Sequence, residues 1–210
     1  MATMVKKGNK GENTRQLIID KATILFTKNG YGQTSLSQIL AATGLAKGGF
    51  YFHFKSKEEL GIAVLNSLDE CWTKEMLPGM LKGRNAKEKL ELLFSRPGDC
   101  CCSSDGLRPT ILLLNLATEM MEVNDRFSQS IQRIFEGWWR TLERVIEEGQ
   151  REKVFREDVD PTAISAIILS NIIGANLLAL LNHRTDIYVR QLSALRSVLF
   201  QGIAAQQPVF

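Results

Sequence analysis

The chain has 210 residues, of which 44% are hydrophobic and 23% charged, and its formal net charge is +3. This composition is that of a globular protein with one large or two small domains, and it excludes disordered, collagen-like and fibrous classes. Residues 1–57 hold nine lysines and arginines against two acidic residues, a net +7, which leaves −4 for residues 58–210. The basic front indicates an anionic partner for this part of the chain, and the alternative is a solvated basic tail.

Helical patterns fill the chain, and clusters of Gly, Pro, Asn and Asp separate them. Residues 1–12 have the composition of a flexible basic arm, and residues 96–106 that of a loop. We therefore expect an all-α protein of about nine helices, with essentially no sheet. The expected helices cover residues 14–29, 35–43, 47–52, 56–77, 85–95, 108–122, 125–152, 161–182 and 187–204.

Several of these helices carry start and stop signals. Gly30, Gly44 and the pair Pro78-Gly79 are placed to end the first, second and fourth helices. Pro161 suits the first turn of its helix. Three residue pairs have capping-box spacing at helix starts: Asn13 with Gln16, Ser35 with Gln38, and Ser56 with Glu59.

The helices over 35–43 and 47–52, joined by a tight turn at Gly44, form a helix-turn-helix. The second helix of such a motif enters the major groove of DNA. Gly48 and Gly49 have no side chains, so the backbone there can approach phosphates or bases closely. Phe52 can contact a thymine methyl group, and the other candidates for contacting phosphates or base edges are Ser35, Lys47, Tyr51, His53 and Lys57.

The stretch from Thr34 to Leu65, TSLSQILAATGLAKGGFYFHFKSKEELGIAVL, resembles the DNA-binding domain of the TetR/AcrR family of bacterial transcriptional regulators. The family pattern is roughly T-x-x-x-I-A-x-x-A-G-[VL]-[SA]-x-G-x-[LF]-Y-x-[HY]-F-x-[SN]-K-[ED]-x-L. The chain departs from it at Leu40 and Thr43, and Ala46 replaces the commoner Ser, which removes a helix cap. The matching positions are Thr34, Ile39, Gly44, Leu45, Ala46, Gly48, Phe50, Tyr51, His53, Phe54, Ser56, Lys57, Glu58 and Leu60.

The resemblance is specific over residues 13–65, and beyond them it rests on size and helix count. It implies a DNA-binding helix-turn-helix domain over residues 1–55 and a helical ligand-binding and dimerisation domain over residues 56–210. It also adds Thr34 as a weaker member of the DNA-contact set. Ile39, Leu45, Phe50 and Phe54 would be the core of the DNA-binding head.

The second domain is rich in aromatic residues and methionine, which suit an adaptable pocket for a small, largely apolar effector. Such residues are more often plain core, and that alternative stays open. The candidates for contacting an effector are Trp72, Met76, Phe94, Met120 and Trp138.

The helix over residues 161–182 is apolar nearly all round and must be buried. Residues 163–183 contain no Asp, Glu, Lys or Arg, but the serines and asparagines along them favour a subunit interface over a membrane span. We expect it to form a four-helix bundle with residues 187–204 across the two-fold axis of a homodimer. The interface candidates are Ile164, Ile168, Asn171, Gly174, Ala175 and Leu178, and a second stripe runs through Ile167, Ser170, Gly174, Leu177 and Leu181.

The cysteines and the N-terminus indicate a cytoplasmic protein. The N-terminal residues show no secretory signal, and the consecutive Cys100, Cys101 and Cys102 cannot build an ordinary disulfide framework. This run is either a plain loop or a thiol sensor of oxidants or electrophiles. No metal site, cofactor motif or catalytic constellation is visible, and His183 has no ligand partner at metal-binding spacing. An enzyme is therefore not expected.

These observations predict a ligand-responsive, sequence-specific regulator. Its partners would be a double-stranded, palindromic DNA operator, a small-molecule effector and a second copy of the chain, with no membrane. A repressor released from its operator by the effector is the main hypothesis. A transcriptional activator, or a redox sensor that uses Cys100–Cys102, is the alternative.

Overall fold

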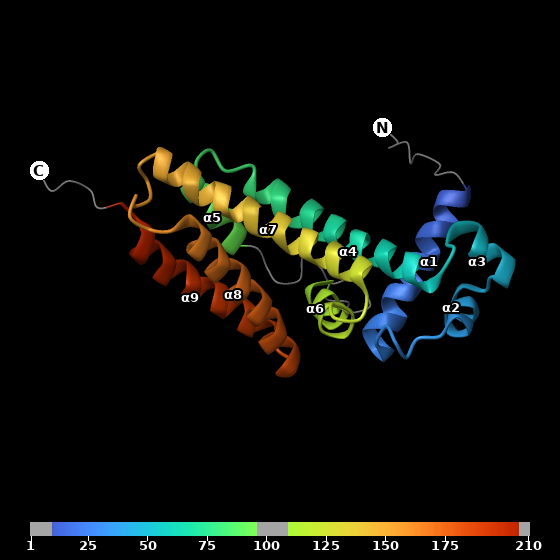
Figure 1. The fold of residues 1–210 in the computed structure, drawn as a ribbon. Coiled ribbons are helices and arrows are strands. Elements are labelled where there is room, and N and C mark those ends of the chain that lie inside the picture. Colours follow the sequence, from blue (N-terminus) through green and yellow to red (C-terminus); the bar gives the residue numbers. More distant parts are fainter. Residues whose placement is uncertain (1–9, 96–108, 206–210) are drawn as a thin grey trace, which may run out of the picture. The chain divides into compact units, whose positions relative to one another are not determined.

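The computed structural model describes residues 10–95 and 109–205, and nine α-helices account for most of these residues (Figure 1). The predicted all-α fold of about nine helices is confirmed for the described part, where an isolated bridge between Phe155 and Ala204 is the only β pairing. Cys100–Cys102 lie outside the described residues. The helices are α1 (Lys10–Asn29), α2 (Leu36–Thr43), α3 (Lys47–His53), α4 (Lys57–Met80), α5 (Ala86–Phe94), α6 (Pro109–Met120), α7 (Asp125–Arg151), α8 (Pro161–Leu181) and α9 (Thr185–Ile203).

Two predicted helix ends were wrong. Helix α1 begins at Lys10, so Asn13 and Gln16 lie inside it and do not cap it; the Gln16 side-chain amide instead donates to Asp20 one turn later, at 2.8 Å. Residues 10–12, expected in a flexible arm, therefore belong to α1. Helix α4 ends at Met80, beyond the stop expected at Pro78.

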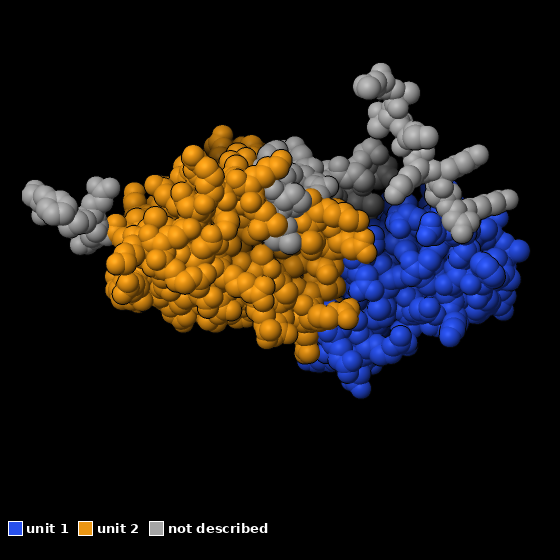
Figure 2. Space-filling model, turned by 90° about the horizontal axis from the view of Figure 1, so that it is seen from above, with its two compact units in different colours: residues 1–68, 112–130 blue, residues 69–111, 131–210 orange. Residues whose placement is uncertain are grey.

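The chain divides into two compact units (Figure 2). Unit 1 comprises residues 1–68 and 112–130, and unit 2 comprises residues 69–111 and 131–210. Helices α4, α6 and α7 each contribute residues to both units. The expected functional boundary at residue 55 stays a prediction, because the compact units divide the chain at other positions.

Aromatic rings form the core of unit 1. Phe26, Phe50 and Phe54 are fully buried. The Tyr31 ring lies 4.9 Å from the Phe127 ring, centroid to centroid, in an edge-to-face contact. A Cβ at Gly61 would approach Phe127 Cζ to 2.4 Å, so this position in α4 must be glycine for the ring to fit. The beginning of α7 thus packs into the same core as the first three helices.

Unit 2 contains α5, α8, α9 and the parts of α4, α6 and α7 that belong to it. Helix α8 packs along α9, which also contacts α5. The Trp72 and Trp138 rings stack with centroids 4.4 Å apart, and Trp138 Nε1 donates to Asp69 at 2.8 Å. Because its indole N–H has a partner, the Trp138 ring is well accommodated in the interior.

Candidate nucleic-acid interface

The predicted helix-turn-helix is formed by α2, the turn at Gly44 and α3. At the start of α2, Ser35 Oγ accepts from the Gln38 N–H at 3.2 Å, and the Gln38 side chain accepts from the Ser35 N–H at 2.7 Å. This reciprocal capping box fixes where α2 begins. Gly44 has φ 68°, a left-handed conformation that only glycine adopts without strain, and it ends α2.

Helix α3 has one buried anchor and an exposed aromatic surface. Phe50 is fully buried, whereas Tyr51 is 47% and Phe52 83% exposed. The Phe52 and His53 rings meet edge to face with centroids 5.0 Å apart. The fold buries little of the apolar surface of Phe52, which favours the prediction that this side of α3 meets a partner.

The two glycines of α3 are not required by the packing of the chain itself. A Cβ at Gly48 would meet no atom within 4 Å, and one at Gly49 would make an ordinary contact of 3.7 Å with Leu45. Glycine is nevertheless among the poorest helix formers, by about 1 kcal/mol relative to alanine. Packing within the chain therefore does not explain these two glycines, and the prediction that the backbone here comes close to DNA would explain them.

The start of α3 agrees with the sequence. Its N-cap is Ala46, which makes no side-chain cap hydrogen bond, as predicted from the departure from the family pattern. Lys47 is exposed and His53 half-buried. The structure thus gathers Lys47, Gly48, Gly49, Tyr51, Phe52 and His53 on one short helix, with Ser35 at the start of the preceding one.

Thr34 is a correction to the expected DNA-contact set. Its side chain is fully buried, and its hydroxyl donates to the Gly30 carbonyl at 2.7 Å. A side chain closed off in this way holds the turn between α1 and α2 and is not available to touch DNA.

Lys57 also turns toward its own unit. Its Nζ lies 4.3 Å from the centroid of the Tyr31 ring and 3.4 Å from the Gly32 carbonyl oxygen. Burial lowers the pKa of Lys57, and the nearby Glu119 carboxylate partly offsets this effect. In this arrangement the ammonium stabilises the turn before α2, and no phosphate contact follows from it.

Of the five residues expected to contact an effector, the structure brings Trp72 and Trp138 into contact, and the set as a whole stays a prediction. Trp72 and Trp138 stack within unit 2, and Phe94 packs against Phe200 with centroids 6.3 Å apart. Met120 belongs to unit 1. Met76 lies in α4, but its side chain is outside the described residues. The stacking of the two rings and the hydrogen bond of Trp138 to Asp69 favour the plain-core alternative for these two positions. Phe94 also lines a surface groove of about 570 Å³ between α5 and α9.

The expected dimer stripe on α8 mixes two faces. Ile168 and Ala175 are buried within the chain, at 0% and 1% exposure, and cannot meet a second copy. Asn171 and Leu178 are exposed, and Ile164 and Gly174 are half-buried. The exposed face of α8 follows mainly the second stripe and contains Ile167, Asn171, Gly174, Leu177, Leu178 and Leu181.

By length and hydropathy, α8 could also span a membrane, and a third of its most apolar window is buried. A helix at a subunit interface has the same properties.

One contact of the motif was not predicted. The Glu119 carboxylate, at the end of α6, accepts hydrogen bonds from the backbone N–H groups of Tyr31, at 3.0 Å, and Gly32. These residues form the turn that leads into α2. No sequence signal pointed to Glu119, because its partners lie nearly ninety residues away and are backbone groups.

Comparison with known proteins supports this architecture in both described parts of the chain. Residues 18–64 match the bacterial regulatory proteins of the tetR family, and residues 109–195 match the tetracyclin repressor-like C-terminal domain. The chain is 29% identical over 161 residues to the transcriptional regulator AcuR of Cereibacter sphaeroides, covering 77% of this chain and 74% of AcuR.

Solved structures share the fold over nearly the whole chain. A TetR-family transcriptional regulator from Cytophaga hutchinsonii superposes with a TM-score of 0.79 at 26% identity, covering 96% of this chain and 100% of that one. The regulator FadR of Bacillus subtilis, solved in complex with stearoyl-CoA, has a TM-score of 0.70 at 25% identity, covering 90% and 98%. The helix-turn-helix and the helical body therefore occur together in known transcriptional regulators.

Proposed function

The chain belongs to the TetR family of bacterial regulatory proteins and is a DNA-binding transcriptional regulator, and from that premise we propose that it is a homodimeric, cytoplasmic repressor. In this proposal it has no enzymatic activity and leaves a palindromic operator when a small, largely apolar effector binds. The observation that carries the proposal is the surface of α3, where exposed aromatic side chains stand beside two glycines that the fold does not need.

DNA contact is assigned to α3 and the start of α2. Tyr51 donates to a phosphate or a base edge, and Phe52 contacts a thymine methyl group in the major groove. Lys47 neutralises phosphate charge. The complete proposed set is Ser35, Lys47, Gly48, Gly49, Tyr51, Phe52 and His53; Thr34 is dropped and Lys57 is given a supporting role.

Dimerisation is assigned to the exposed face of α8 together with α9. A Cβ at Gly174 would meet nothing within the chain, so the small residue serves a close approach by another helix. The two recognition helices of such a dimer enter successive major grooves about 34 Å apart, which requires an operator with two-fold symmetry.

The effector is assigned to unit 2, whose interior is lined by apolar and aromatic side chains. FadR, which shares the fold, was solved with the acyl thioester stearoyl-CoA, and this supports a ligand with a large apolar part. Release from the operator requires that the effector bind more tightly to a state in which the two heads no longer match the grooves.

The test is selection of binding sites for the purified protein from a random double-stranded DNA library. We expect a palindromic winner whose binding falls about tenfold or more with Tyr51→Ala, since a hydrogen bond to a charged group contributes about 1.5–3 kcal/mol. Tyr51→Phe keeps the ring and removes only the hydroxyl, so it separates the phosphate contact from packing. The proposal would be overturned if the protein bound DNA weakly, with strong salt dependence and no sequence preference, and if Tyr51→Ala and Tyr51→Phe bound equally well.

A further inference from the structure

The Glu119 carboxylate ties the end of α6 to the turn that precedes the helix-turn-helix. It accepts from the backbone N–H groups of Tyr31, at 3.0 Å, and Gly32. A Cβ at Gly32 would lie 2.7 Å from Glu119 Oε1, so the turn leaves room for the carboxylate only because this residue is glycine. Two charge-assisted hydrogen bonds from adjacent backbone groups hold a turn in one orientation.

The same turn is held from the other side by α4. Lys57 Nζ lies over the Tyr31 ring and within 3.4 Å of the Gly32 carbonyl oxygen, so the carbonyl and the N–H groups of the turn meet charges of opposite sign. The Tyr31 ring in turn packs edge to face on Phe127 of α7. A third contact, between Arg126 Nη1 and Glu58 Oε1 at 2.6 Å, joins the beginnings of α7 and α4.

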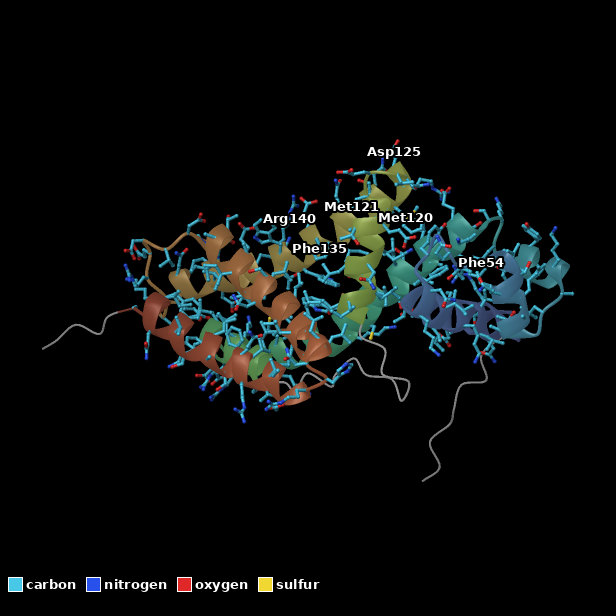
Figure 3. All side chains as sticks on the ribbon, turned by 90° about the horizontal axis from the view of Figure 1, so that it is seen from below. Phe54, Met120, Met121, Asp125, Phe135 and Arg140 are labelled. Carbon is cyan, nitrogen blue, oxygen red and sulfur yellow. The ribbon has the colours of Figure 1, made fainter. Side chains whose placement is uncertain are left out.

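These contacts define an α6–α7 corner, residues 112–130, that belongs to the same compact unit as α1–α3. Met120, Met121 and Asp125 mark this corner in Figure 3. The corner continues along the chain into unit 2 through both of its helices. The head therefore has one covalent connection to the rest of the chain, through α4, and a second, non-covalent one at the corner.

We propose that Glu119 is a positioning residue that fixes the direction of the recognition helix, and thereby the spacing between operator half-sites that the dimer accepts. The inference rests on the proposed function, because it needs a symmetric operator. The segment held by Glu119 leads directly into α2: Thr34 bonds back to the Gly30 carbonyl, and Ser35 caps the helix. Without the carboxylate contact, the turn is held at the corner by the packing of Tyr31 on Phe127, and the angle between the head and the corner becomes less well defined.

The consequence is a separation of two kinds of specificity. Base preference within a half-site comes from side chains on α3, which do not touch Glu119. Preference for spacing comes from the relative placement of two heads, since one extra base pair moves a half-site by about 3.4 Å and turns it around the helix axis. Loss of the Glu119 contact should relax the second preference and leave the first unchanged.

The experiment uses the full-length protein and the selected operator in variants with one base pair added or removed between the half-sites. In Glu119→Gln, the side-chain NH₂ faces one of the two backbone donors, so one hydrogen bond and the charge are lost. Wild type should prefer the selected spacing by about tenfold or more, and Glu119→Gln by less than about threefold, in keeping with the loss of one charge-assisted bond. The order of preference among single-base changes in a half-site should be the same in both proteins.

The matched control is Glu122→Gln, which removes the same charge from an exposed residue one turn away. It should keep the wild-type spacing preference. Gly32→Ala reaches the same contact from the other side, since its Cβ displaces the carboxylate, and it should relax spacing as Glu119→Gln does. Circular dichroism and thermal unfolding establish whether each variant is folded. If Glu119→Gln does not fold, the spacing preference of Gly32→Ala tests the proposal in its place.

The outcomes separate the two proposals. If wild type selects no symmetric operator, the proposed function fails. If wild type selects one and the folded Glu119 and Gly32 variants discriminate between spacings as wild type does, the positioning role of Glu119 is wrong and the repressor proposal stands. A uniform loss of affinity at every spacing would assign Glu119 a purely structural role and would also overturn the inference.

Discussion

Helix α3 and helix α8 each present apolar side chains and a glycine to the outside, whereas α4 and α7 contain glycines that face the interior. A Cβ at Gly48 of α3 or Gly174 of α8 would meet no atom within 4 Å. A Cβ at Gly61 of α4 would come within 2.4 Å of the Phe127 ring, and one at Gly149 of α7 within 2.0 Å of the Phe155 ring. The inner glycines are explained by the fold of this chain, and the outer ones are not.

An open glycine alone does not mark a partner surface, because a Cβ at Gly11, Gly137 or Gly202 would also meet no atom within 4 Å. Helices α3 and α8 are favoured as partner surfaces because their open glycines lie beside exposed apolar side chains. A glycine inside a helix lowers its stability by about 1 kcal/mol relative to alanine, so an unneeded one would be replaced readily in a surface helix. Gly48 stands beside exposed Phe52, and Gly174 stands among exposed leucines and Ile167. The first combination suits the grooves of DNA, and the second suits an identical helix. Substitutions at these glycines therefore test whether α3 and α8 contact partners.

The largest effect is expected for Gly174→Ile. Because the position is open within the chain, the monomer should keep its helical content, but the two-fold axis would bring two added side chains into one interface. Overpacking of about 1–3 kcal/mol per site predicts a dimer dissociation constant raised about a hundredfold, measured by sedimentation equilibrium. Gly137→Ile is the matched control, since a Cβ at Gly137 in α7 also meets nothing within 4 Å. Equal dissociation constants for the two variants would remove α8 from the interface.

The second effect is expected for Gly48→Ala compared with Gly61→Ala. Gly48→Ala should leave the free energy of unfolding equal to that of wild type or raise it by up to about 1 kcal/mol. It should nevertheless weaken operator binding about tenfold, because the added methyl group stands where the backbone approaches DNA. Gly61→Ala should do the reverse: a loss of about 1–3 kcal/mol in stability from the clash with Phe127, with base preference unchanged. The measurements are urea unfolding and operator titration.

A Gly48→Ala variant that binds its operator as wild type does would contradict the comparison, because α3 would then not be in close contact with DNA. A lower free energy of unfolding for Gly48→Ala would also contradict the comparison, because the open space around Gly48 predicts no loss of stability.

The features that the sequence predicted correctly are local ones. The capping box at Ser35, the left-handed Gly44 and the uncapped Ala46 each depend on residues within four positions of one another. At Ser56 half of the predicted box forms: Ser56 Oγ accepts from the Glu59 N–H at 3.1 Å, but the Glu59 carboxylate accepts from the Lys55 N–H at 2.8 Å. Hydrophobic periodicity then placed the helices, with errors at their ends. Asn13 failed as a cap because α1 extends one turn further toward the N-terminus, which no local signal forbids.

The features that were missed depend on contacts between distant segments. Because α8 is apolar nearly all round, its sequence does not reveal which stripe packs on α9, and Ile168 was assigned to the wrong face. Thr34 matches the family pattern, but burial gives it a hydrogen bond within the turn. The Glu119 contact joins a carboxylate to backbone N–H groups 87 and 88 residues away, and backbone donors leave no trace in a sequence.

The smallest effect is expected for Tyr31, a buried residue that packs next to Gly61 in the interior of unit 1. Burial, and then the nearby Glu58 and Glu119 carboxylates, raise the pKa of Tyr31 from 10.0 to about 12. Between these values the folded state keeps a proton that the unfolded state has released, so the stabilisation is complete below pH 10 and is lost as the pH rises toward 12. One proton corresponds to at most about 1.4 kcal/mol per pH unit, which predicts that wild type loses about 1 kcal/mol more than Tyr31→Phe between pH 10 and 11. Urea unfolding at a series of pH values measures the difference. If the two proteins lost stability in parallel, the Tyr31 hydroxyl would have to be solvated, and the turn that Glu119 holds would be more open than the structure describes.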